Sequence, residues 1–157
     1  MTESFETGGP VWTKGQARIV RLSGLAGIIG GILLIVVAIV AWVMVTSQLR
    51  AEQITIPDDA MAFQGQIVDG PIDAFIQADI INHHALEMTD GKTYAQLDQD
   101  DPTRAVVMNA SFLRASLFTS VISYGLAAFA AGAGVLFILF GWSMRTIVPP
   151  LPKQATA

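Results

Sequence analysis

The chain has 157 residues, of which 52% are apolar and 14% charged, with a net charge of −4 and no cysteine. Soluble domains usually carry about a quarter charged residues, so this deficit of charge indicates a membrane protein. A sequence without cysteine excludes disulfides, thiol catalysis, thiolate zinc sites and iron–sulfur ligation. No basic excess is present to mark a nucleic-acid-binding protein.

Two long runs of the sequence carry no charge. The first has 28 residues between Arg21 and Arg50, and the second has 30 residues between Arg114 and Arg145. About 20 apolar residues suffice for a helix to cross the hydrocarbon core of a bilayer. We therefore predict an all-α membrane protein with transmembrane helices at residues 22–46 and 113–143. The first run is too long for a cleaved signal peptide and favours a retained signal anchor.

The charges flanking these runs predict an orientation. The tails at 1–21 and 144–157 are both net positive, whereas the segment 47–112 has three basic and eleven acidic residues, a net charge of −8. Short loops rich in Lys and Arg stay in the cytoplasm. We expect a multi-pass protein of the plasma membrane with both termini cytoplasmic and the segment 47–112 outside the cell.

Small residues recur at helical spacing in both predicted spans, and neither uncharged run contains Asp, Glu, Lys, Arg or His. Small side chains let transmembrane helices approach closely, whereas transport pathways usually require intramembrane charges. The stripes predict helix packing, either of the two spans with each other or of one span with a partner protein. The predicted packing positions are Gly24, Gly27, Gly31, Ser120, Ser123, Ala127, Ala131 and Gly134.

The segment between the spans is predicted to form a small module with a hairpin and helices. Residues 53–56 and 65–68 alternate in polarity as short strands do, and a turn at 57–59 follows the first of them. Asp69-Gly70-Pro71 is typical of a helix start, and the helix is expected to run to about Thr89. Its predicted apolar stripe consists of Ile72, Phe75, Ile76, Ile80 and Leu86.

Two further elements are expected before the second span. Thr93 is predicted to cap a short turn that ends at Leu97, and a single helix is expected from about Thr103 to Trp142, so that it projects above the bilayer. A module of this size without disulfides cannot bury a large core of its own. We therefore expect it to gain stability from the membrane surface, the projecting helix or a partner.

One group of residues has the chemistry of a metal site. Asp79, His83 and Glu87 are spaced at i, i+4 and i+8, so they share one face of the predicted helix. Imidazole and carboxylate groups can bind zinc or another divalent ion. A solvated polar face explains the same pattern, and no established metal motif is present. The run at 98–101 lacks the glycine and glutamate of a calcium loop and is read as an acidic turn.

Three sequence blocks, at residues 78–87, 91–98 and 110–120, carry a resemblance. They are similar to a family of small actinobacterial two-span membrane proteins, often labelled aromatic ring-opening dioxygenases. Such an enzyme needs an enclosed iron site, whereas the histidines here are two neighbours on one short helix. We expect no enzymatic activity and no cofactor. Accessory subunits of this size occur in the actinobacterial supercomplex of cytochrome bcc and cytochrome c oxidase, so the resemblance implies a partner of that kind.

These observations predict a non-catalytic accessory or assembly subunit of a plasma-membrane complex, with the respiratory supercomplex as the first candidate. Its partners would be integral membrane subunits, including those of cytochrome c oxidase or cytochrome bcc, together with the lipid bilayer. The alternative is an extracytoplasmic ligand or metal sensor that transmits its signal through the two helices.

Overall fold

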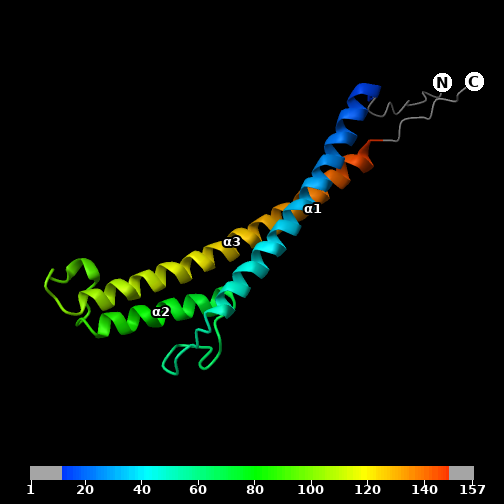
Figure 1. Ribbon diagram of the computed structural model, residues 1–157. Helices are drawn as coiled ribbons and strands as arrows, with labels where there is room; N and C mark the ends of the chain where they lie inside the picture. Colours follow the sequence, from blue (N-terminus) through cyan, green and yellow to red (C-terminus); the bar gives the residue numbers. More distant parts are fainter. Residues whose placement is uncertain (1–11, 149–157) are drawn as a thin grey trace, which may run out of the picture. The chain divides into compact units, whose positions relative to one another are not determined.

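The computed structural model describes residues 12–148. Most of these residues are helical, and none of them lies in a strand (Figure 1). Three helices follow in order: α1 (Lys14–Ala51), α2 (Pro71–Glu87) and α3 (Arg104–Ile147), with a short 3-10 helix η1 (Tyr94–Gln96) before α3. The predicted all-α class is confirmed, and α1 and α3 are each long and apolar enough to cross a membrane.

Both predicted spans lie inside a longer helix. The range 22–46 is part of the 38-residue α1, and the range 113–143 is part of the 44-residue α3. The predicted N-terminal tail is helical from Lys14 onward. The remainder of the two predicted tails, at 1–11 and 149–157, falls outside the described residues.

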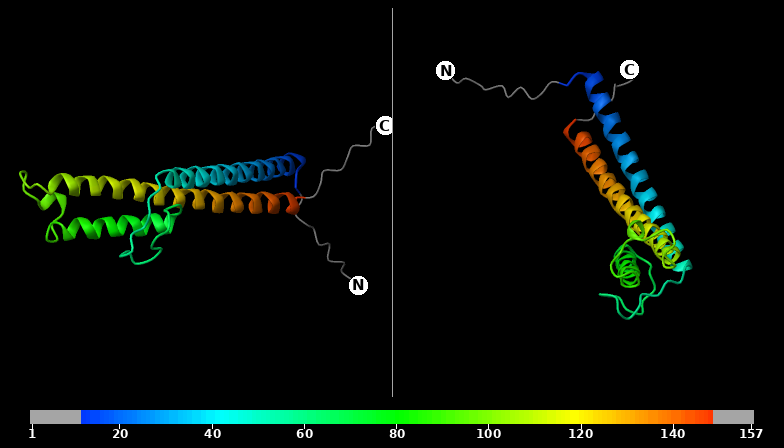
Figure 2. Two further views of the ribbon diagram at one scale, coloured as in Figure 1. Left: turned by 60° about the horizontal axis from the view of Figure 1, so that its bottom comes forward. Right: turned by 90° about the vertical axis from the view of Figure 1, so that its left-hand side faces the viewer.

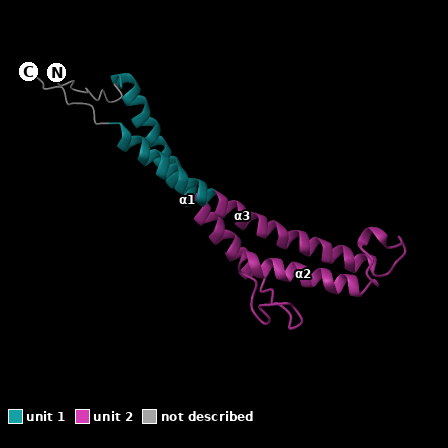
Figure 3. Ribbon diagram, turned by 180° about the vertical axis from the view of Figure 1, so that it is seen from behind, with its two compact units in different colours: residues 1–36, 130–157 teal, residues 37–129 magenta. Residues whose placement is uncertain are grey.

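The chain divides into two compact units, which Figure 3 distinguishes by colour. The first combines residues 1–36 with 130–157, and the second comprises residues 37–129. In the first unit, the described parts of α1 and α3 run antiparallel and side by side in both views of Figure 2. In the second unit, α2 lies along the N-terminal half of α3.

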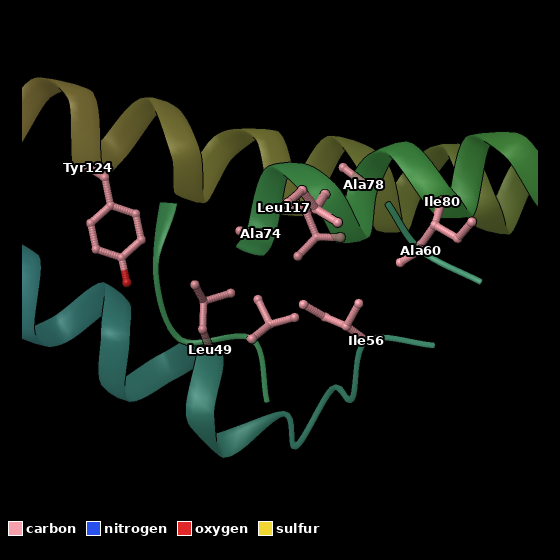
Figure 4. Packing of buried hydrophobic residues seen from close by; sticks show 10 residues of the cluster. Leu49, Ile56, Ala60, Ala74, Ala78, Ile80, Leu117 and Tyr124 are labelled. Carbon is pink, nitrogen blue, oxygen red and sulfur yellow. The ribbon is translucent and has the colours of Figure 1, made fainter. Parts of the chain in front are cut away.

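A small apolar core holds the second unit together (Figure 4). Leu49 near the end of α1, Ile56 and Val68 from the connecting loop, Ala74 on α2 and Leu117 on α3 are all buried in it. The core thus draws on every long element of the unit. The buried side chains of the unit therefore come from α1, α2, α3 and the loop between α1 and α2.

The ends of α2 follow from local sequence. Pro71 occupies the first turn, where its missing N–H costs no hydrogen bond, and the Asp73 carboxylate accepts hydrogen bonds from the backbone N–H groups of Asp69 and Gly70 at 2.7 and 2.9 Å. After the helix, Asp90 and Gly91 have φ values of 51° and 81°. This left-handed conformation ends a helix, and glycine adopts it without strain.

The predicted strands at 53–56 and 65–68 are not formed. Their backbones meet only at an isolated bridge between Thr55 and Ile67, with hydrogen bonds from Ile56 N–H to Gln66 and from Val68 N–H to Ile54. A single pair of short strands is marginal by itself. The loop is instead fixed by its two apolar side chains, Ile56 and Val68, which are fully buried in the core.

The predicted apolar stripe of α2 is correct only in part. Ile76 and Ile80 are buried, whereas Ile72 is 63% exposed and Phe75 is 48% exposed. Small and polar residues complete the buried face: Asp73, Ala74, Gln77, Ala78 and Ala85. Alanine side chains allow α2 to lie close to its neighbours on two sides, so its buried face is wider than an isoleucine stripe.

The single long helix predicted from about Thr103 to Trp142 is confirmed as α3, which begins at Arg104 and continues to Ile147. The Asp101 carboxylate accepts a hydrogen bond from the backbone N–H of Thr103 at 2.8 Å, which orders the chain before the first turn. No proline occurs between Arg104 and Ile147 to break the helix.

Candidate functional site: the helix contacts and the polar junction

Four glycines of the first unit form the contact between α1 and α3. A Cβ atom built on Gly24 would lie 2.6 Å from the carbonyl oxygen of Gly141, and one built on Gly134 would lie 2.6 Å from that of Gly31. Real Cβ atoms do not approach other atoms so closely, so only glycine fits at these positions. The two helices therefore meet backbone to backbone, as transmembrane helices with small interface residues do.

The glycines belong to a seven-residue repeat. In α1 the buried positions Ala17, Gly24, Gly31 and Ala38 are each seven residues apart, and in α3 the same holds for Ala127, Gly134 and Gly141. Helices with a seven-residue repeat of contact positions pack with a slight left-handed crossing. The repeat explains why the small residues, rather than the abundant isoleucines and leucines, face inward.

Most of the predicted packing positions lie at or beside this contact. Gly24, Gly31 and Gly134 are in it, and a Cβ on Gly27 would lie 3.3 Å from the carbonyl oxygen of Phe137. Ala127 is buried and Ala131 is half-buried. These positions therefore lie at or near a contact within the chain.

The predicted serine positions of α3 have a different role. The Ser120 and Ser123 hydroxyls donate hydrogen bonds to the carbonyls of Ser116 and Thr119, one turn earlier in the same helix. Neither serine is buried. The buried positions of this part of α3 are Leu117 and Tyr124, which sequence reasoning did not single out.

Tyr124 is the centre of a polar junction in the second unit. Its side chain is 1% exposed, its hydroxyl is 2.7 Å from the Thr46 hydroxyl, and it donates a hydrogen bond of 3.0 Å to the backbone carbonyl of Asp69. The ring of Trp42 packs edge-on against it, with 4.6 Å between ring centroids. One side chain of α3 thus connects α1 with the segment that leads into α2.

An ion pair extends this junction at the surface. The Arg50 guanidinium donates a hydrogen bond of 2.9 Å from Nε to the Asp69 carboxylate, and both side chains are substantially exposed. Exposed ion pairs contribute little stability. The signal that could have revealed the junction was a tyrosine in an apolar run, because a buried hydroxyl requires a partner.

The predicted metal ligands are only partly brought together. His83 Nε2 lies 3.1 Å from a carboxylate oxygen of Glu87, but Asp79 does not join them. Within residues 12–148, no group of three His, Asp or Glu side chains is placed to hold a metal ion. The spacing did place the three residues on one helix, but the third side chain does not converge on the pair.

The second histidine of α2 connects the helix to the loop before it. His84 Nε2 lies 2.6 Å from a carboxylate oxygen of Asp59. This hydrogen bond is the main reason that the pKa of Asp59 falls below its ordinary value of 3.8. The pair fastens the 57–64 loop to the outer part of α2.

The predicted acidic turn at 98–101 is a structural loop at the start of α3. The hydrogen bond from the Thr103 hydroxyl lowers the pKa of Asp101 below its ordinary value. Arg104 donates a hydrogen bond of 2.7 Å to the carbonyl of Leu97 and lies 4.1 Å above the ring centroid of Tyr94. These contacts fold the loop back onto the first turn of α3.

Comparison of the chain with protein-family models, with curated proteins and with solved structures gave no match.

Proposed function

We propose that this chain is a non-catalytic accessory subunit of a membrane-protein complex. In this proposal α1 and α3 anchor it as a helical hairpin, and the paired α2 and outer part of α3 dock on the extracytoplasmic face of a partner. The respiratory assembly of cytochrome bcc and cytochrome c oxidase is the candidate partner that the resemblance suggests.

The exposed side chains of the two long helices support the anchor. Ile29, Val37, Leu136 and Phe140 are each more than half exposed. Large apolar patches on a water-soluble monomer are rare, whereas lipid covers such side chains at no cost. The glycine contact adds support, because it is the type of interface that lipid-immersed helices use.

Aromatic and basic residues suggest where the bilayer ends. Trp42 and Tyr124 are in contact, and tryptophan and tyrosine concentrate at membrane interfaces. Arg21 precedes Trp42 by 21 residues, and Arg145 follows Tyr124 by the same number. At 1.5 Å per residue this is about 31 Å, close to the thickness of the hydrocarbon core. The positive tails would then lie in the cytoplasm.

This depth assignment leaves the N-terminal part of α3 outside the bilayer. α2 packs along it, with the Phe75 ring 5.9 Å from that of Phe118. α2 carries Asp79, His83 and Glu87, which are too costly to place in hydrocarbon. The outer part of α3 that α2 covers therefore faces water in this proposal.

The observation that carries the docking proposal is the apolar surface on this water-facing part of α3. Phe112 is 65% exposed and Leu113 is 55% exposed, and Val106 and Met108 nearby are also exposed. Exposure of the Phe112 side chain to water is unfavourable, and the small core of this module offers little to offset it. A partner protein that covers these side chains would account for them.

The test is affinity purification of the tagged protein from its native membrane in mild detergent, with mass spectrometry and a haem spectrum of the eluate. We expect membrane subunits in near-stoichiometric amounts, and haem if the partner is the respiratory assembly. Phe112→Glu should abolish the capture. Gln66→Glu, which adds the same charge at an exposed position of the loop before α2, should retain it.

Two outcomes would count against the proposal. Recovery of the chain without any stoichiometric partner would contradict the accessory role. Equal capture by both variants would show that the partner does not use the outer face of α3.

A further inference from the structure

A small cavity of about 50 Å³ lies between α2 and α3 in the second unit. Thr93 and Tyr94 close it from the segment that joins the two helices. Its other polar lining residues are Asn82 on α2 and Ser111 and Arg114 on α3. Three separate parts of the chain thus meet around one small cavity, which is partly open to solvent.

Some of the hydrogen-bond donors that line this cavity have no acceptor in the described part of the chain. The Nε atom of Arg114 is buried and has no hydrogen-bond partner in the described part of the chain. The hydroxyls of Ser111 and Thr93 already donate, to the carbonyl of Val107 and to the side chain of Gln96. In the described part of the chain, the donors left for a ligand include the Nε–H of Arg114, the side-chain amide of Asn82 and the hydroxyl of Tyr94.

The charge at the cavity is also unbalanced. None of its lining residues is acidic, although the segment 47–112 carries eleven acidic residues. Among residues 12–148, Arg114 forms no ion pair. A buried donor of a cation without an acceptor is costly, and arginine forms its strongest hydrogen bonds with anions.

We propose that this cavity binds a small monovalent anion, such as chloride or formate, through the Nε–H of Arg114 and the amide of Asn82. The volume holds only a few water-sized groups, so larger anions are excluded. A water molecule can accept the same hydrogen bonds but cannot balance the charge of the guanidinium. The bound anion would fasten α2 to α3 at its position.

The proposal predicts that the stability of the full-length protein depends on the size of the anion present. In detergent, the unfolding temperature should be a few °C higher in sodium chloride than in sodium gluconate at equal ionic strength. Chloride fits the cavity and gluconate does not. Tryptophan fluorescence provides the unfolding signal.

Matched variants separate this cavity from general charge effects. Arg114→Gln should remove the difference between the two salts. Arg50→Gln deletes the same charge at an exposed site that is already paired with Asp69, and it should keep the difference. Ala110→Leu should fill the cavity while leaving Arg114 in place, and it should also lose the difference.

A direct measurement keeps the test independent of folding. The ³⁵Cl NMR line of the wild-type protein should broaden more than that of Arg114→Gln at equal protein concentration. Equal broadening by the two proteins would place the anion elsewhere and overturn the proposal. Equal unfolding temperatures of the wild type in both salts would show that water alone fills the cavity, and would also overturn it.

Discussion

At the scale of single residues, the hydroxyl of Tyr124 connects parts of the second unit that are far apart in the sequence. It links Thr46 of α1 with the backbone carbonyl of Asp69, at 2.7 and 3.0 Å. Phenylalanine at this position would keep the ring contact with Trp42 but leave both oxygens without this partner. A buried polar group that loses its partner costs about 1–3 kcal/mol.

We therefore expect Tyr124→Phe to lower the free energy of unfolding by about 1–3 kcal/mol. Denaturation followed by tryptophan fluorescence would measure the change. Tyr94→Phe is the control, because only the ring of Tyr94, beneath Arg104, is in use. If both variants lose the same stability, the hydroxyl of Tyr124 has no special role.

A second residue-scale prediction concerns the pH dependence of the Asp59–His84 pair. The hydrogen bond with His84 lowers the pKa of Asp59 in the folded protein below 3.8. A lowered carboxyl pKa means that the pair stabilises the fold above the ordinary pKa, and that this contribution is lost as the pH falls through the folded value. The window is therefore acidic, below pH 3.8.

Carboxyl NMR titration should show the pKa of Asp59 rising toward its ordinary value in His84→Ala. His83→Ala should have a smaller effect, because His83 acts on Asp59 only through its more distant charge. An unchanged pKa in His84→Ala would mean that the pair is not formed in solution.

At the scale of helices, the contact between α1 and α3 provides a sharp comparison between neighbouring glycines. A Cβ on Gly31 would meet the backbone of Gly134 and the side chain of Ile138, whereas a Cβ on Gly30 would meet nothing within 4 Å. Gly30 and Gly31 are consecutive residues of the same helix, α1. They differ only in the face of the helix that they occupy.

We expect Gly31→Leu to separate the helices and to lower stability by at least about 1–3 kcal/mol, the usual cost of overpacking. Gly30→Leu should be tolerated. Gly27→Leu should be intermediate, since its neighbours are 3.3 Å or more away. Thermal unfolding in detergent would rank the three variants, and a Gly30→Leu variant as damaged as Gly31→Leu would contradict the assigned contact.

The elements themselves were largely predictable, because each depends on local signals. Uncharged runs predicted α1 and α3, and Gly70-Pro71 together with Asp90-Gly91 predicted the ends of α2. The strands were not predictable in this way, because alternation over four residues does not reveal whether a longer ladder forms. The buried face of α2 was equally hard to predict. Ile72 is exposed and Ala74 is buried, because Ala74 packs in the core with Ile56 and Val68 of the preceding loop.

The contacts between elements were predictable only where glycine left a periodic pattern. Gly24, Gly31 and Gly134 could be found from their spacing alone. A tyrosine in an apolar run indicates that its hydroxyl has a partner, but it does not identify the partners of Tyr124, which lie 78 and 55 residues away along the chain. The third metal ligand failed for a related reason: shared helical spacing does not bring three side chains to one point.

At the scale of the whole molecule, the proposed orientation can be tested by labelling, since the chain contains no cysteine of its own. In intact cells, a membrane-impermeant maleimide should label Gln99→Cys, in the exposed loop before α3, but not Ile32→Cys, which the proposal places in lipid. Phe112→Cys should be protected in the native membrane, where the partner covers it, and labelled in the isolated protein. Thr146→Cys should be labelled only after the membrane is permeabilised.

Each of these variants has a defined contradictory result. Labelling of Thr146→Cys in intact cells would reverse the orientation. Protection of Phe112→Cys in the isolated protein, as well as in the native membrane, would place the outer part of α3 in lipid rather than against a partner. Protection in the native membrane alone would agree with a bound partner.

The seven-residue repeat of the glycine contact has a mechanical consequence. Gly24 and Gly31 leave equivalent gaps on α1, as do Gly134 and Gly141 on α3. A shift of α1 along α3 by one repeat, about 10.5 Å, would again bring one glycine of α1 opposite one glycine of α3. The glycine positions alone therefore allow more than one register of α1 against α3. The hydrogen bond between Thr46 and Tyr124 selects one of these registers, because the two hydroxyls can meet in only one of them. Gly31 and Thr46 belong to the same continuous helix, α1. A chain without that hydroxyl contact would keep α1 and α3 paired, but the glycine contact alone would not fix the register between them.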